Sequence, residues 1–279
     1  MDKNSTKYQV KSSPAIRATT ASYGEHYILS KNGILNIYGN CTAEELDKGI
    51  SERTEWGITL IQFARQFAVE DQLLYQLNKK VIKKFPQCSL RLVLNGEGAI
   101  KDLEVLKHLP NLIDLRIELT DNIDLAPINK FCKLKSLAIG GDKIFIKEIT
   151  KQESIEELFV FERVKDIELI GEMQNLRKLT ISNMSLKNLG FLQGLKQLKE
   201  LHFILGGTKN LEVLSEMDTV EVISFTWVRE LKMEHLKPIN DMRSLKKIKF
   251  DRQRHLLNLD WLKDKSIKTE IISCKNFRK

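Results

Sequence analysis

The chain has 279 residues, of which 42% are hydrophobic and 29% are charged, and its formal net charge is +8. This composition is typical of a globular protein with apolar material for one or two domains, and it excludes a largely disordered chain. No stretch of 18 consecutive apolar residues occurs, so we expect no membrane-spanning helix.

Residues 1–30 are predicted to form a flexible polar tail. They lack the apolar segment of a secretory signal peptide, so we expect a cytoplasmic protein. The cysteines agree with a reducing compartment, because they stand far apart and show neither Cys-x-x-Cys nor zinc-ligand spacing. They are Cys41, Cys88, Cys132 and Cys274.

Residues 31–86 are predicted to form an N-terminal cap of strands alternating with helices, an order that favours parallel strand pairing. Apolar runs indicate strands at 34–38 and 58–63. Thr42 and Glu45 have the spacing of a capping box, so a helix is expected to begin after Thr42.

A second helix of this cap is predicted from apolar residues that recur every four positions and end at Pro86. These residues are Leu73, Leu77, Val81 and Phe85. The alternative for the whole segment is a separate small α/β domain.

Residues 87–266 are predicted to repeat one short unit. Each unit begins with the pattern apolar-x-x-apolar-x-apolar, and the pattern returns every 21 to 25 residues. Of the 24 column positions in eight copies, 23 are apolar, which is far above the 42% expected by chance. The copies begin at Leu112, Leu134, Ile155, Leu176, Leu198, Val220, Leu245 and Ile267.

The stretches between the predicted strands have apolar residues every three positions, as in Leu186, Leu189, Leu192 and Leu195. This period fits a 3₁₀ turn and not a long α-helix. Residues 267–279 are predicted to hold a final partial repeat, with Glu270 interrupting its middle column, and a basic C-terminal cap.

These columns resemble the short leucine-rich repeats of internalins and of the leucine-rich regulatory subunit of protein phosphatase 1. The resemblance covers about residues 89–279. It implies an α/β fold: a curved leucine-rich-repeat solenoid with a parallel concave β-sheet and short 3₁₀ or irregular convex segments, preceded by the cap.

One position departs from this resemblance. The family usually has Asn three residues after the last column, where its side chain hydrogen-bonds the neighbouring turns. Here none of the seven equivalent positions holds Asn, so we expect irregular turns and a looser registry between repeats. The residues at these positions are Thr120, Asp142, Arg163, Met184, Gly206, Val228 and Gln253.

The chain carries no motif for phosphate binding, a nucleophilic serine or a catalytic zinc. Its five histidines fall in different repeats and have no partner at metal-ligand spacing. The sequence therefore predicts no catalytic residue, no metal site, no cofactor and no enzymatic activity.

Side chains alternate across a strand, so the residues between the columns should point out from the concave face. Several of these are large and apolar, which is typical of a protein interface. Lysines should steer a partner toward the C-terminal side. The predicted partner-binding residues, with Trp227 at the edge of the group, are Phe159, Phe161, Lys178, His202, Ile204, Val222, Trp227, Lys247 and Lys249.

Two functions follow from these patterns. The first is a monomeric, non-enzymatic protein–protein interaction module that binds a protein on its concave face, with a cytosolic inhibitor or immunity-type protein as its specific form. The alternative is binding of nucleic acid or another anionic surface through the basic C-terminal region. Residues 243–279 hold 12 basic and four acidic residues, which accounts for the whole net charge of +8.

Overall fold

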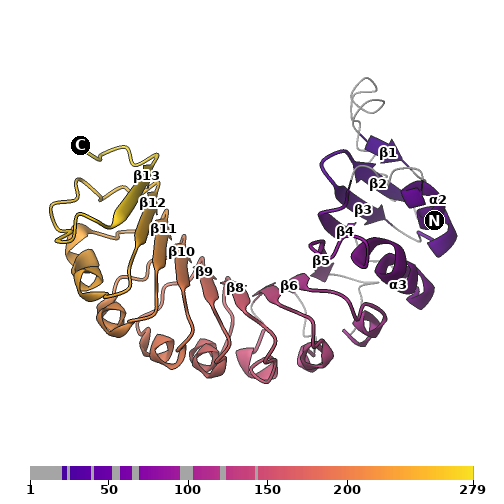
Figure 1. Ribbon diagram of the computed structural model, residues 1–279, viewed down its shortest axis with the longest axis horizontal. Helices are drawn as coiled ribbons and strands as arrows, with labels where there is room; N and C mark the ends of the chain where they lie inside the picture. Colours follow the sequence, from indigo (N-terminus) through magenta and orange to yellow (C-terminus); the bar gives the residue numbers. More distant parts are fainter. Residues whose placement is uncertain are drawn as a thin grey trace, which may run out of the picture.

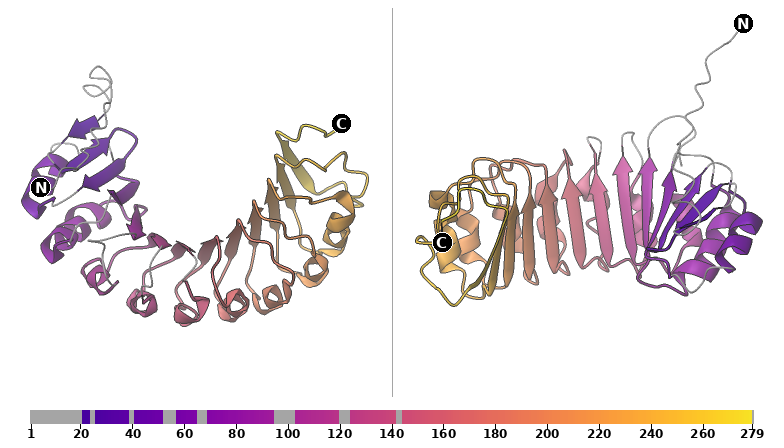
Figure 2. Two further views of the ribbon diagram at one scale, coloured as in Figure 1. Left: turned by 180° about the vertical axis from the view of Figure 1, so that it is seen from behind. Right: turned by 90° about the horizontal axis from the view of Figure 1, so that it is seen from above.

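The computed structural model describes residues 21–23, 26–38, 41–51, 57–64, 69–94, 103–119, 124–141 and 144–278. Within them, 13 strands form a single sheet whose strand order follows the chain. The sheet bends into an open arc, with the strands along its inner side and short helices along its outer side (Figure 1, Figure 2). No helix in these ranges is both long and apolar enough to cross a membrane.

The strands are Ala21–Tyr23 (β1), Tyr27–Ser30 (β2), Ile34–Tyr38 (β3), Leu60–Ala64 (β4), Ser89–Leu94 (β5), Asp114–Leu119 (β6), Ser136–Gly140 (β7), Glu157–Phe161 (β8), Lys178–Ser182 (β9), Glu200–Ile204 (β10), Val222–Thr226 (β11), Lys247–Asp251 (β12) and Lys268–Ile272 (β13).

The helices are Ala43–Ser51 (α2), Asp71–Leu77 (α3), Asn78–Ile82 (η2), Glu104–His108 (η3), Ala126–Lys130 (η4), Ile146–Glu148 (η5), Ile167–Glu172 (η6), Gly190–Gly194 (η7), Glu212–Glu216 (η8) and Met233–Asp241 (η9). From η3 onward they are 3₁₀ segments, as the three-residue apolar period predicted.

Residues 1–30 were predicted to be a flexible tail, but two strands, β1 and β2, lie within this segment. β1 pairs antiparallel with β2, and β2 pairs antiparallel with β3, so the sheet already begins within this segment. Tyr27 and Leu29 alternate inward and are buried, which gives the hairpin its own share of the core. Residues 1–20 of the predicted tail lie outside the described residues.

From β3 onward the strands pair in parallel, and β4 joins the strands of residues 31–86 to β5 without a break. α2 begins where the capping box predicted, since Thr42 Oγ1 accepts a hydrogen bond from the Glu45 N–H (3.1 Å). The Glu45 carboxylate accepts bonds from the backbone N–H (2.7 Å) and ring of His26, and so ties α2 to the hairpin.

The predicted helix before Pro86 is present as two consecutive segments, because α3 widens into the π-helix η2. Asn78, at the change of pitch, is buried, and its side-chain oxygen accepts bonds from the backbone and side chain of Asn111 (both 3.3 Å). This contact ties the helix to the turn before β6.

The apolar columns form one continuous core between the sheet and the outer segments. In β6–β12 the column residues are at most 7% exposed, and the central ones, such as Leu201, are fully buried. Near the C-terminal end, the rings of Phe203, Phe225 and Phe250 stack in sequence with centroids 5.5 and 5.7 Å apart. The predicted α/β arrangement, a curved solenoid with a parallel inner sheet and short 3₁₀ segments outside, is confirmed.

The last repeat is in a different register from the predicted one. β13 pairs Thr269 with Ile248 and Ile271 with Phe250, so Thr269 and Ile271 take the inward positions. Glu270 therefore lies on the concave side and does not interrupt the core column. It accepts ion pairs there from Lys247 (2.8 Å) and Lys249 (3.9 Å), contacts that the predicted register could not make.

The strand ends share one backbone conformation, repeat after repeat. The residue that follows each strand from β8 to β13 has a left-handed φ between 49° and 62°. From β8 to β12 its N–H donates to the carbonyl of the last residue of the next strand, as from Leu205 to Thr226 (2.8 Å). The expectation of irregular turns is thus wrong for these repeats, because this ladder of backbone bonds aligns them. The residues are Glu162, Asn183, Leu205, Trp227, Arg252 and Ser273.

Candidate functional site

The concave face of β6–β12 presents three rows of side chains, one from each outward position of the strands. The parallel register aligns the rows. The middle row consists of Arg116, Ala138, Phe159, Thr180, His202, Ser224 and Lys249. Between β4 and β11 this face contains a hollow of about 560 Å³.

Two phenylalanines of β8 occupy the centre of this hollow. The ring centroids of Phe159 and Phe161 are 5.6 Å apart, and both side chains are half-buried. Phe161 lies against Gly140 so closely that a Cβ there would come within 2.1 Å of the ring. The small residue therefore makes a seat that holds the ring in place on the sheet.

On the other side of this aromatic pair, the floor is made of short polar side chains. Thr180 and Ser182 of β9 are each only 7% exposed, and they pair in register with Phe159 and Phe161. Beyond them, His202 and Ile204 of β10 also line the hollow. The result is an apolar depression with hydroxyl groups at its base.

His202 is fixed from both sides. Its Nδ1 is 2.6 Å from Ser224 Oγ, and its Nε2 is 3.1 Å from the Glu200 carboxylate. Burial lowers the pKa of His202, and the bond to Glu200 partly offsets this. The ring is therefore mostly neutral at neutral pH.

A serine, a histidine and a carboxylate in this order also occur in hydrolases. Acyl transfer needs N–H donors aimed at the developing oxyanion. Here the backbones of β10 and β11 are paired on both sides within the sheet, so they offer no such donors. The arrangement therefore fits a hydrogen-bonded floor better than a catalytic site. The described residues also contain no group of three potential metal ligands.

The charged residues of the concave face pair largely with one another. Lys178 lies 3.6 Å from Glu157 and 4.0 Å from Glu200. Toward the N-terminal side, Arg91 pairs with Glu118. At the other end, the hydrogen bond from Lys247 lowers the pKa of Glu270, which keeps this carboxylate ionised. The apolar centre is thus flanked by charges that already have partners.

The structure brings most of the predicted partner-binding residues together. Phe159, Phe161, Lys178, His202 and Ile204 line the hollow. The remaining predicted concave residues, Val222, Lys247 and Lys249, follow on β11 and β12.

Trp227 does not join this group. It follows the end of β11, at the left-handed position, and is 43% exposed. Leu205, at the same position one repeat earlier and 38% exposed, was not predicted. The column pattern ends with the strand, and it carries no signal for exposure at this turn.

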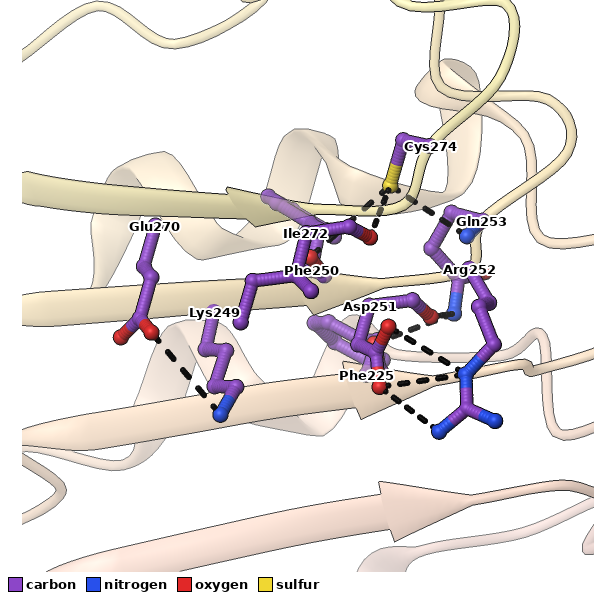
Figure 3. A network of polar contacts seen from close by, with 9 residues as sticks. All are labelled: Phe225, Lys249, Phe250, Asp251, Arg252, Gln253, Glu270, Ile272 and Cys274. Atoms are coloured by element: carbon purple, nitrogen blue, oxygen red, sulfur yellow. Dashed lines mark hydrogen bonds and ion pairs between the residues drawn. The ribbon is translucent and has the colours of Figure 1, made fainter.

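The position where Asn was expected is filled differently in the C-terminal repeats (Figure 3). Gln253 is buried, and its side-chain amide donates to the carbonyls of Phe225 (3.1 Å) and Asp251 (3.3 Å). Cys274 is the equivalent residue of the last repeat, and its sulfur accepts a bond from the Gln253 N–H (3.3 Å). An amide and a thiol thus make the contacts between repeats that an Asn column would make.

In this structure the four cysteines are free thiols, of which Cys41 and Cys88 are buried, Cys274 is half-buried and Cys132 is exposed. Burial raises the pKa of the Cys41 and Cys88 thiols to about 12. At neutral pH they are protonated core residues without nucleophilic character.

The repeat length, the parallel inner strands and the outer 3₁₀ segments together define the architecture of a leucine-rich-repeat solenoid. No protein-family model matches the chain, and no curated protein matches it.

Three solved structures are similar in fold. An internalin from Listeria monocytogenes has a TM-score of 0.38 and 13% identity, covering 89% of this chain and 90% of its own. Internalin C2 from the same species has a TM-score of 0.44 and 17% identity, covering 74% and 84%. The plant peptide hormone receptor RGFR1, in complex with RGF2, has a TM-score of 0.42 and 13% identity, covering 93% and 49%. Because these TM-scores and identities are low, the assignment of the fold rests on the repeat geometry of this chain and not on the three structures.

Proposed function

We propose that this protein is a non-enzymatic interaction module that binds a protein partner on its concave face. The observation that carries the proposal is the aromatic pair Phe159 and Phe161, half-buried at the centre of the hollow. Large apolar side chains in a concave, partly desolvated position are typical centres of protein interfaces.

The charges around the hollow describe the kind of partner. Lys178, Glu157 and Glu200 already neutralise one another, so a strongly charged partner would gain little from them. We expect an apolar protruding element to enter the hollow, with polar contacts at its rim. In this proposal Lys247 and Lys249, whose two positive charges Glu270 offsets only in part, guide the partner by charge. Val222 extends the apolar contact.

In its specific form, the proposal is a monomeric cytoplasmic inhibitor or immunity-type protein that acts by covering a surface of its target. The support is a continuous sheet that presents an apolar centre, in a chain that carries no recognised catalytic motif. Trp227 contributes at the margin of such a contact and not at its centre, because it lies at the strand end.

The experiment compares the wild type with a Phe159→Ala/Phe161→Ala variant in affinity capture from the lysate of the native host. Captured proteins are identified, purified and titrated by calorimetry. Tyr75→Ala is the matched control, since Tyr75 is an aromatic residue that is 49% exposed on α3, on the outer side. Circular dichroism establishes that all three proteins are folded.

We expect one protein to bind the wild type and the Tyr75 variant with equal affinity, and the Phe159/Phe161 variant at least about 30-fold more weakly. Equal binding by all three would contradict the concave site. Captured nucleic acid whose affinity falls steeply with salt would favour the alternative function instead.

A further inference from the structure

A second surface lies along the strand ends of the C-terminal repeats, apart from the concave hollow. At this edge, Leu205 and Trp227 occupy equivalent positions of neighbouring repeats and are 38% and 43% exposed. Their backbones are one strand spacing apart in the sheet, so the two side chains belong to one continuous edge.

Leucine and tryptophan are both unfavourable residue types for the backbone conformation at these two positions. The left-handed conformation disfavours L-residues with a bulky side chain, whereas Asn and Gly adopt it easily. Asn183 shows that the position accepts Asn in this chain. Leucine and tryptophan incur this conformational cost, and they also expose apolar surface to water. Strained residues of this kind are concentrated at functional sites.

Beside Trp227 the surface is hollowed by about 380 Å³ and is basic. Among the residues that the structure describes, the lining includes Arg252, Arg254 and Lys275 and contains no acidic residue. Arg252 lies over the Trp227 ring (5.9 Å to its centroid) and also pairs with Asp251 (2.9 Å). Within the described part of the chain, Arg254 and Lys275 take part in no ion pair, which leaves two cations without an acidic partner in the lining that they share with Trp227.

We infer that this edge binds an acidic peptide segment of a protein partner, with an apolar side chain seated on Leu205 and Trp227. Arg254 and Lys275 pair with the carboxylates that flank the apolar residue. The surface is independent of the concave hollow, whose lining includes none of these residues.

The edge favours a peptide over nucleic acid. Proteins that bind single strands stack successive bases on several aromatic side chains. Among the described residues that line this hollow, Trp227 is the single aromatic one, and its neighbour along the edge is the aliphatic Leu205. An aliphatic and an aromatic side chain together suit an apolar amino-acid side chain.

The test uses the full chain and four fluorescein-labelled probes in anisotropy titrations. The first probe is a short peptide in which a Leu-Phe pair is flanked by Glu and Asp. The second replaces the acids with Lys, and the third replaces the Leu-Phe pair with Gly-Gly. The fourth is an oligothymidine of similar length.

Two matched variants distinguish binding in this hollow from a general effect of the positive charge of the protein. Arg254→Ala/Lys275→Ala removes two positive charges from the hollow. Lys263→Ala/Lys265→Ala removes the same charge from exposed positions of the same C-terminal region, outside the hollow. A third variant, Trp227→Asn, removes the indole and leaves a residue that accepts the backbone conformation, so it is expected to fold.

We expect the first peptide alone to bind the wild type with micromolar affinity. Its affinity should fall about tenfold in Arg254→Ala/Lys275→Ala and in Trp227→Asn, and less than about twofold in Lys263→Ala/Lys265→Ala. A Phe159→Ala/Phe161→Ala variant should bind it as the wild type does.

The inference is overturned if the acidic peptide shows no binding at about 1 mM, or if both charge variants weaken it equally. Preferential binding of the oligothymidine would also overturn it, in favour of nucleic acid.

Discussion

The concave floor of β7–β11 and the strand-end edge of β10–β13 belong to overlapping repeats, yet they hold their side chains by opposite means. On the floor, side chains pack on the neighbouring strand, as the Phe161 ring packs against Gly140. At the edge, Trp227 stands in solvent on a left-handed backbone. Side-chain alternation sets the chemistry of the floor, whereas backbone conformation sets that of the edge.

The largest effect is expected from Phe225→Ala, because this ring lies in the core beneath both surfaces and stacks between Phe203 and Phe250. We expect the free energy of unfolding, measured in urea, to fall by about 3–5 kcal/mol. Ser224→Ala, on the outward side of the same strand, should cost less than about 1.5 kcal/mol. Equal losses would mean that the stack does not support the two surfaces.

A smaller effect is expected on the floor alone from Gly140→Ala. The added methyl group would displace the Phe161 ring, at a cost of about 1–3 kcal/mol in unfolding free energy. In a Phe161→Ala background the same change should cost little, since the ring is gone. A double-mutant cycle in urea measures this coupling, and purely additive losses would contradict the proposed seat.

At the edge, Leu205→Asn relieves an unfavourable backbone conformation. Leu257→Asn is the matched control, because Leu257 is also exposed (44%) and has no left-handed φ. We expect Leu205→Asn to be more stable than the control variant by about 1 kcal/mol. Equal unfolding free energies would show that the left-handed position imposes no cost on leucine.

The smallest effect is a pH dependence that belongs to the floor. Burial lowers the pKa of His202 in the folded state, so the unfolded chain binds a proton more readily. The resulting stability is present above the ordinary histidine pKa and is lost as the pH falls through it.

We therefore expect the wild type to lose more unfolding free energy than His202→Gln between about pH 7.5 and 5.5. Glu200, Lys178 and Lys249 face the ring and stay in both proteins, so the difference between the two slopes isolates the histidine. Identical slopes would contradict the lowered pKa.

The sequence predicts the floor well, because the strand period of two is visible wherever leucines mark every inward position. In the last repeat the register is ambiguous, because either Thr269 and Ile271 or Glu270 and Ile272 could take the two inward positions. The ion pairs of Glu270 with two lysines favour the observed register, and such cross-strand contacts are not visible in one strand.

The edge was predicted least well. Trp227 was predicted at the edge of the concave group, and it lies at the strand end. Leu205 was not predicted to be exposed, because a left-handed turn residue leaves no periodic signal. The hairpin of β1 and β2 was also missed, since its few inward residues, such as Leu29, are too short a pattern to separate from a polar tail.

Each strand of this sheet pairs only with its immediate neighbours, from β1 to β13. A slight rotation of every strand against the next therefore adds up along the row. The two ends of the arc stand apart (Figure 1), so such a rotation would change the distance between them far more than it would change any one hydrogen bond. We therefore expect the opening of the arc to adapt to partners of different width while the core between sheet and outer segments stays packed.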